Sequence, residues 1–246
     1  MFDFGPQSAV GIVGVVREMC ILKFSNADIF TGETKPTVSY TTALTSQAAH
    51  GVIDFCGCDQ TLGSLSIHYS SPAAKKDSKQ IAPYRSDSPA TLTVQATGTE
   101  LVRNQINFEG ALGYRYAGAG TNLFCNLKST STGGFRVSSG VSGFDWGAAW
   151  GGTNIVVDGT GTLYVSADSA PAFGTRAVAK TSGVTLTLKD SGKLYLEGGE
   201  TFIGWATKDG EDIPRGTYTA ANCDWIEGEG TLRVLHEHAG IVLIVR

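Results

Sequence analysis

The segment GTGTLYV at residues 159–165 returns as GEGTLRV at residues 228–234, and these two stretches decide the interpretation of the chain. Each begins with glycines, which favour a turn, and continues with alternating apolar and polar residues, which is typical of a half-buried β-strand. Shorter versions of the pattern occur at residues 63–67, 89–94, 134–137 and 192–196. The sequence therefore predicts a series of similar short strands, each preceded by a turn.

The spacing of these copies indicates a stacked architecture. Counted from the first apolar residue of each copy, at positions 65, 92, 135, 163, 194 and 232, the intervals are 27, 43, 28, 31 and 38 residues. Units of this length cannot bury their own apolar faces and gain a continuous core only by stacking. We expect further strands at residues 106–108, 154–157 and 184–188. A sandwich of hairpins is the alternative, because Asp158-Gly159 and Asp209-Gly210 are hairpin-turn dipeptides.

Composition supports an all-β chain and excludes several classes of protein. The 246 residues include 32 glycines and only 17% charged residues, against about 25% charged in ordinary globular proteins. The glycines keep no three-residue period, which excludes collagen, and apolar residues along the whole length argue against disorder. Helical periodicity is nearly absent, and its one candidate, residues 15–24, fits a helix and a strand equally well.

Charge and hydropathy bound the partners of the chain. The net charge is −4 and no run of Lys and Arg occurs, so we expect no nucleic acid partner. The longest apolar runs, residues 9–16 and 241–245, are too short to span a bilayer, so we expect no membrane span.

Metal and thiol chemistry is weakly indicated. Cys56 and Cys58 would lie on one face of an extended strand, and we expect the five cysteines to pack in buried positions rather than bind metal. His236 and His238 form a possible metal pair without a third ligand. The acid-rich region of residues 209–229 matches no calcium loop and is expected to be a solvated turn. We therefore predict no metal site and no cofactor.

The two segments of residues 159–165 and 228–234 resemble the Gly-x-Gly-Thr-Leu-x-Val/Leu signature of autotransporter passenger-type β-strand repeats, found in secreted and surface proteins of bacteria. Residues 54–66, 129–140 and 216–219 look like the same family, so the resemblance covers about residues 50–235. It implies a single-stranded right-handed parallel β-helix at the cell surface or outside the cell. The implied organisation is an N-terminal rung or cap at 1–50, solenoid repeats at 51–235 and a closing strand at 236–246.

Period-two alternation assigns a face to each residue of the predicted strands. The apolar residues point inward, and Arg136, Tyr164, Tyr195 and Arg233 point outward with Ser66 and Thr93. If the copies stack in register, these residues form one external ladder at about 4.8 Å per step. Two rings flanked by cations suit a sugar, because the apolar face of a pyranose lies flat on a ring. The alternative is that the outward residues pair only to stabilise the sheet.

Two tryptophans extend this candidate carbohydrate site. Trp146 and Trp150 lie in the segment FDWGAAWGG at residues 144–152, a predicted loop or corner where large rings can be partly exposed. The alternative for both is that they fill corners of the core.

The motifs of β-helix polysaccharide hydrolases, clustered Asp pairs with Gly-His-Gly and Arg-x-Lys, do not occur. We therefore expect a non-enzymatic extracellular stalk or surface-display segment with weak binding to a polysaccharide or a host-surface glycan. Two alternatives stay open. One is a fragment of a β-helix polysaccharide lyase or glycoside hydrolase. The other is an adhesin module that self-associates through its solenoid ends.

Overall fold

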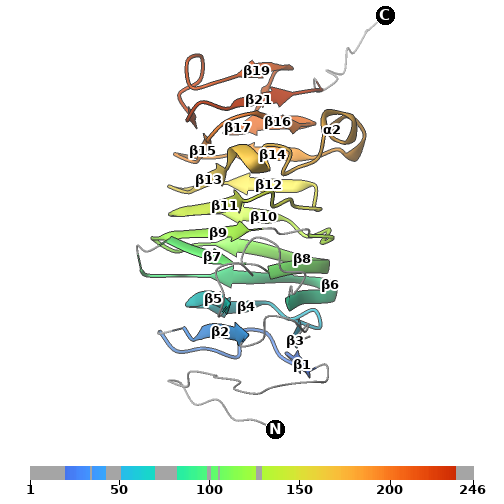
Figure 1. Cartoon of the computed structure of the whole chain (residues 1–246), viewed down its shortest axis with the longest axis vertical. Helices are drawn as coiled ribbons and strands as arrows, with labels where there is room; N and C mark the ends of the chain where they lie inside the picture. Colours follow the sequence, from blue (N-terminus) through green and yellow to red (C-terminus); the bar gives the residue numbers. More distant parts are fainter. Residues whose placement is uncertain are drawn as a thin grey trace, which may run out of the picture.

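A computed structural model describes residues 20–33, 35–42, 51–69, 82–98, 101–104, 106–125 and 129–236. Strands stack along the longest axis of the molecule, from β1 at one end to β19 and β21 at the other (Figure 1). The apolar runs at residues 9–16 and 241–245 lie outside the described residues. Within the described part of the chain, no helix is long and apolar enough to cross a membrane.

The first half of the chain forms strands β1 (Cys20–Lys23), β2 (Thr37–Thr42), β3 (Gly51–Asp54), β4 (Gln60–Leu62), β5 (Ser64–Tyr69), β6 (Ala82–Val94), β7 (Leu101–Asn104), β8 (Ile106–Tyr116) and β9 (Thr121–Cys125). The second half forms β10 (Phe135–Val137), β11 (Val141–Asp145), β12 (Asn154–Val157), β13 (Thr162–Val165), β14 (Thr185–Leu188), β15 (Lys193–Leu196), β16 (Glu200–Ile203), β17 (Trp205–Lys208), β18 (Glu211–Ile213), β19 (Gly216–Tyr218), β20 (Ile226–Glu227) and β21 (Thr231–Val234). A 3-10 turn, η1 (Ala167–Ser169), and one short helix, α2 (Arg176–Ser182), interrupt the strands.

Two long sheets dominate the fold. A ten-stranded sheet has the order β1-β3-β6-β8-β10-β12-β14-β17-β18, with β4 also paired to β6, and a six-stranded sheet has the order β20-β15-β13-β11-β9-β7. From β7 to β15 successive strands of the chain alternate between these two sheets, so each turn of the chain adds one strand to each of them. Smaller sheets join β2 with β5 and β16 with β21 and β19, and none of the sheets closes on itself.

Parallel pairing is the rule within these sheets, which confirms an all-β fold with parallel sheets and excludes a sandwich of hairpins. Phe135 pairs with Ile155, 20 residues later, whereas Asn154 pairs with Thr185, 31 residues later, because η1 and α2 lie in the longer turn. The exceptions are two antiparallel pairs, β17 with β18 and β19 with β21, both at the C-terminal end of the stack. That the turns form a right-handed β-helix stays a prediction.

The predicted alternation of faces is confirmed. Each copy of the repeated motif is a strand, and the inward positions with described side chains are at most 2% exposed: Leu65, Leu92, Val94, Phe135, Val137, Leu163, Val165, Leu194, Leu196, Leu232 and Val234. The ambiguous segment 15–24 contains β1, so its described part is a strand rather than a helix.

Aromatic side chains form the centre of the core. The ring of Phe135 lies 5.1 Å from Tyr114, 4.8 Å from Phe144 and 5.2 Å from Trp150, measured between ring centroids. Trp150 is 4% exposed, and its Nε1–H donates to the carbonyl of Gly133 at 3.0 Å. The alternative that Trp150 fills a corner of the core, where the chain turns after β11, is therefore confirmed, and its place in an exposed carbohydrate site is wrong.

Corner turns use backbone conformations in the left-handed region. Asp190 and Asp209 have φ values of 54° and 53°, and their carboxylates link successive turns. The N–H of Gly159 donates to Asp190 Oδ2 at 3.3 Å, and the N–H of Asp190 donates to Asp209 Oδ1 at 2.8 Å. Asp209-Gly210 is the hairpin turn between β17 and β18, whereas Asp158-Gly159 connects β12 to β13 in another sheet.

Removing a core ring tests the stack. We expect Phe135→Ala to lower the free energy of unfolding by about 3–5 kcal/mol, because Phe135 is fully buried among four rings. Phe202→Ala is the matched control, since Phe202 is half-buried on β16 and faces outward. Urea unfolding followed by tryptophan fluorescence measures both; equal losses would contradict the assigned core.

Candidate functional site

The predicted external ladder is split among three sheets. Tyr164 and Tyr195 are direct register partners in the six-stranded sheet. Arg136 lies instead in the ten-stranded sheet, paired with Arg115 and Val156, and Arg233 lies in the three-stranded sheet. A single ladder of these four residues is therefore wrong. The repeated motif marks any strand that follows a turn, and such strands belong to more than one sheet.

The two tyrosines form a stacked pair on the outer face of the six-stranded sheet. Their ring centroids are 5.5 Å apart, and the ring planes differ by 11°. Tyr195 is 37% exposed, whereas Tyr164 is partly covered. Burial raises the pKa of Tyr164 to about 12, aided by the carboxylates of Glu197 and Asp145 and by a hydrogen bond with Glu197. Glu197 also accepts the N–H of Ala167 at 3.0 Å and so connects the pair to η1.

Both predicted arginines are held by carboxylates. Arg136 forms an ion pair with Asp158, and Arg233 donates to Glu200 Oε1 through Nε at 2.9 Å and Nη2 at 2.6 Å. Arg233 also donates to the hydroxyl of Thr217 on β19. Arg233 on β21 therefore links its strand to β16, which carries Glu200, and to β19, which carries Thr217.

Trp146 is half-buried, with a φ of 52°, in the turn after β11, and its N–H donates to Asp145 Oδ1 at 3.0 Å. Trp150 points into the core instead, so the structure does not bring the two indoles together as one exposed surface.

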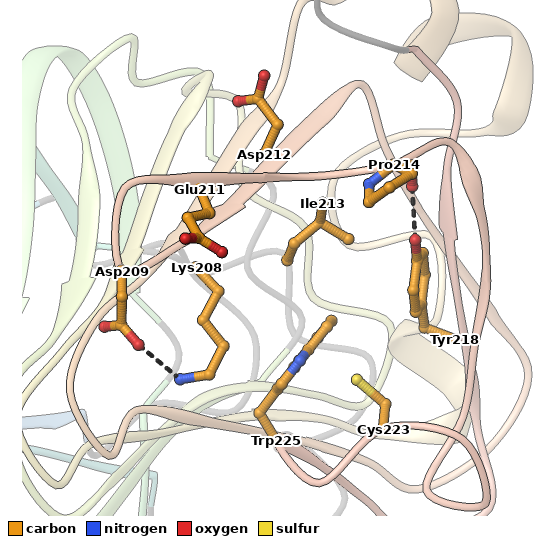
Figure 2. Close-up of a pocket in the computed structure, with 9 residues that line it drawn as sticks. All are labelled: Lys208, Asp209, Glu211, Asp212, Ile213, Pro214, Tyr218, Cys223 and Trp225. Carbon is orange, nitrogen blue, oxygen red and sulfur yellow. Dashed lines mark hydrogen bonds and ion pairs between the residues drawn. The ribbon is translucent and has the colours of Figure 1, made fainter.

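A cavity of about 540 Å³ lies beneath the β17–β18 hairpin (Figure 2). Trp225 and Ile213 supply its apolar walls, with Tyr218 and the thiol of Cys223 beside them. The hydroxyl of Tyr218 donates to the carbonyl of Pro214 at 2.7 Å, which fixes this corner. Sequence reasoning missed the cavity, because an antiparallel hairpin brings residues 208–214 over Trp225.

Acidic residues form the outer rim of this cavity. Asp209, Glu211 and Asp212 are all exposed, which confirms a solvated acidic turn. The ammonium group of Lys208 lies 3.1 Å from Asp209 Oδ2. The pKa of Asp209 is lowered by the hydrogen bond from Lys208 and by the N–H of Asp190. The carboxylate of Asp209 thus links its own turn to the turn at Asp190.

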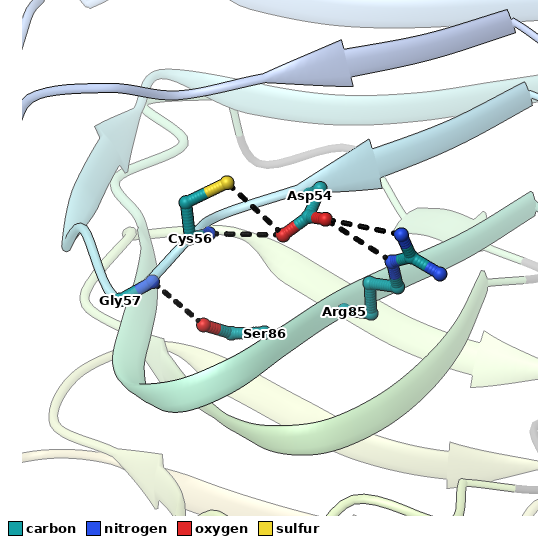
Figure 3. Close-up of polar contacts among 5 residues, drawn as sticks. All are labelled: Asp54, Cys56, Gly57, Arg85 and Ser86. Carbon is teal, nitrogen blue, oxygen red and sulfur yellow. Dashed lines mark hydrogen bonds and ion pairs between the residues drawn. The ribbon is translucent and has the colours of Figure 1, made fainter.

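Cys56 lies at a corner of the stack and not in an extended strand (Figure 3). Its N–H and thiol donate to Asp54 Oδ1 at 3.0 and 3.3 Å, while Arg85 donates to Asp54 Oδ2 through Nε and Nη2 at 3.2 and 3.1 Å. Burial alone would raise the pKa of Asp54, but these hydrogen bonds outweigh it and lower the pKa. Desolvation and Asp54 raise the pKa of Cys56, which disfavours a reactive thiolate.

The expectation of buried thiols is confirmed for Cys125 and wrong for Cys56, which is exposed, while Cys58 and Cys223 are half-buried. His236 stacks on Trp205 with centroids 4.6 Å apart, and its Nε2 lies 3.0 Å from the carbonyl of Lys180. His238 lies outside the described residues. Over the described ranges, no group of three or more His, Cys, Asp or Glu side chains is placed to hold a metal ion.

Alkaline titration tests the environment of Tyr164. Because the folded pKa of about 12 exceeds the ordinary value of 10, the folded state holds this proton more tightly than the unfolded state. The resulting stability is present below pH 10 and is lost as the pH rises through about 12. Tyr164→Phe should therefore lose less stability than the wild type between pH 9 and pH 11.5 in urea unfolding. Parallel losses in both proteins would contradict the assigned environment, and unfolding at pH 8 is the reference for each protein.

The chain was compared with family models, with curated proteins and with solved structures. No family model, no curated protein and no solved structure matches it. The residues and contacts of the molecule therefore carry the assignment of function.

Proposed function

We propose that the protein is a non-enzymatic structural segment, a right-handed parallel β-helix of the autotransporter passenger type that acts as an extracellular stalk or surface-display element. One observation carries the proposal: between β7 and β15 each turn of the chain adds one parallel strand to both long sheets. Such a body has a length set by the number of turns, at about 4.8 Å for each.

The outer face of the ten-stranded sheet supports a scaffold role. Lys23, Asp54, Arg85 and Glu109 occupy neighbouring register positions on β1, β3, β6 and β8, so positive and negative side chains alternate along the stack. Opposite charges in adjacent positions stabilise a sheet and oppose slippage of its register. Arg85 and Asp54 form one such pair of opposite charges, with Nη2 of Arg85 3.1 Å from Oδ2 of Asp54.

Three carboxyl groups are held in structural hydrogen bonds and are poorly suited to act as a general acid. A general acid needs a raised pKa, whereas the pKa values of Asp54, Asp158 and Asp209 are lowered. Burial opposes the shift at Asp54 and Asp158, and hydrogen bonds that hold strands and turns outweigh it. The hydrogen bonds of these carboxylates stabilise the stack.

Deleting one complete turn tests the proposed role. Removal of residues 135–154 joins Gly134 to Ile155, which then occupies the position of Phe135 beside Tyr114, while β13 replaces β11 beside β9. We expect a soluble protein that unfolds cooperatively, with lower stability because Trp150 is lost. Pulsed EPR between spin labels at Ser25 and Ala220 should show a distance shorter by about 4.8 Å.

The control deletion removes residues 135–155, one residue more, and would turn Val157 outward because side chains alternate with period two. We expect this variant to be markedly less stable than the 20-residue deletion. Equal unfolding of both variants, or release of sugar fragments from polysaccharides by the intact chain, would refute the modular scaffold.

Weak carbohydrate binding is a second candidate function, favoured by the exposed ring of Tyr195 beside Tyr164. If a pyranose stacks on this pair, Tyr195→Ala should abolish signals on a glycan array, whereas Phe202→Ala on another sheet should keep them. Unchanged signals after Tyr195→Ala would leave the pair a purely structural ladder.

A further inference from the structure

A shallow groove of about 480 Å³ crosses the outer face of the ten-stranded sheet, away from the tyrosine pair. Gly113 and Gly134 occupy adjacent register-related positions in it and add no side chains to the groove. Arg115, Arg136 and Thr93 line one side of the groove, and their side chains are exposed or half-exposed.

The groove is long enough for a polymer. Thr61, Thr93, Arg115, Arg136 and Val156 are successive register partners on β4, β6, β8, β10 and β12. Four steps of about 4.8 Å give a row roughly 19 Å long, several times the size of one sugar ring. An extended glycan advances by about one strand spacing for each sugar unit, so its repeating groups match repeating side chains.

One end of the row carries unbalanced positive charge. Arg115 and Arg136 are neighbours in register, and like charges in such positions destabilise a sheet. Asp158 forms an ion pair with Arg136, whereas Arg115 donates through Nε to the hydroxyl of Ser138 at 3.2 Å. The charge of Asp158 also acts on Arg115, but among the residues that the structure describes no carboxylate forms an ion pair with Arg115, so the two guanidinium groups share one carboxylate.

The other end of the groove supplies hydrogen-bond acceptors. Asp59 Oδ1 accepts the N–H of Thr91 at 2.7 Å, and Asp28 Oδ1 accepts the hydroxyl of Thr61 at 3.2 Å. These contacts use one oxygen of each exposed carboxylate, and no side chain or backbone group among the described residues donates to the second oxygen, which is left for hydroxyl donors. The groove thus offers cations for carboxylates and acceptors for hydroxyl groups, both of which a uronic acid polymer carries.

We propose that this groove binds an extended acidic polysaccharide of the polyuronate class. A carboxylate of the polymer lies between Arg115 and Arg136, and hydroxyl groups of a neighbouring sugar donate to Asp28 and Asp59. The site is independent of the tyrosine pair and of the stalk role, so a separate experiment tests it.

The experiment measures binding of polygalacturonate to the full chain by calorimetry. Arg115→Gln should weaken binding by about tenfold or more, because hydrogen bonds between charged groups are lost. Arg215→Gln, which removes an equal charge from an exposed position outside the groove, should leave the affinity unchanged. Fully methyl-esterified polygalacturonate has the same backbone without the charges. We expect the wild-type protein to bind it no more tightly than Arg115→Gln binds the unesterified polymer.

Further variants distinguish binding in this groove from binding elsewhere on the molecule. Gly134→Ser adds a side chain to the groove without a change of charge and should also weaken binding, while Tyr195→Ala should retain it. Thermal unfolding confirms that each variant is folded. Absence of polygalacturonate binding, equal binding of polyglutamate, or unchanged affinity after both Arg115→Gln and Gly134→Ser would overturn the proposal.

Discussion

Backbone hydrogen bonding between successive strands is the constraint on which the structure depends. In a parallel stack each strand leaves N–H and C=O groups for the next, and an end strand exposes an unpaired edge. At the C-terminal end the ten-stranded and the three-stranded sheet each finish with an antiparallel pair: β18 pairs with β17, and β19 with β21. The new edge at β18 is three residues long, carries Glu211 and Asp212, and is followed by Pro214. Such an edge resists the addition of a further strand to β18.

Corners satisfy the same constraint by a different route. A strand can enter the next sheet only if the chain turns, and positive φ values at Trp146 and Asp190 contribute to such turns, while those at Cys56 and Asp209 bend the chain between strands of the ten-stranded sheet. Side chains then bond the backbone groups that the turn leaves without partners, as Asp209 does for the N–H of Asp190.

The sequence predicted the strands better than their partners. Alternation of apolar residues correctly assigned Leu163 and Val165 to the core, because burial of one face follows from local pattern. The pattern does not predict which strands pair: Arg136 and Tyr164 lie in the same motif but in different sheets. The helix α2 was overlooked although Thr175 precedes it and Gly183, with φ 68°, ends it. The sequence pattern does not indicate Arg115, because its position beside Arg136 follows only from the pairing of β8 with β10.

Every parallel pair of strands described in the stack joins residues between 20 and 32 positions apart, from Phe135 with Ile155 to Gln60 with Leu92. No pairing needs the two ends of the chain to meet, so the entropy of loop closure stays nearly the same at each addition. We therefore expect folding to nucleate on any adjacent pair of turns and to propagate in both directions along the stack. By the same reasoning, damage to one turn should divide the molecule into two cooperative blocks.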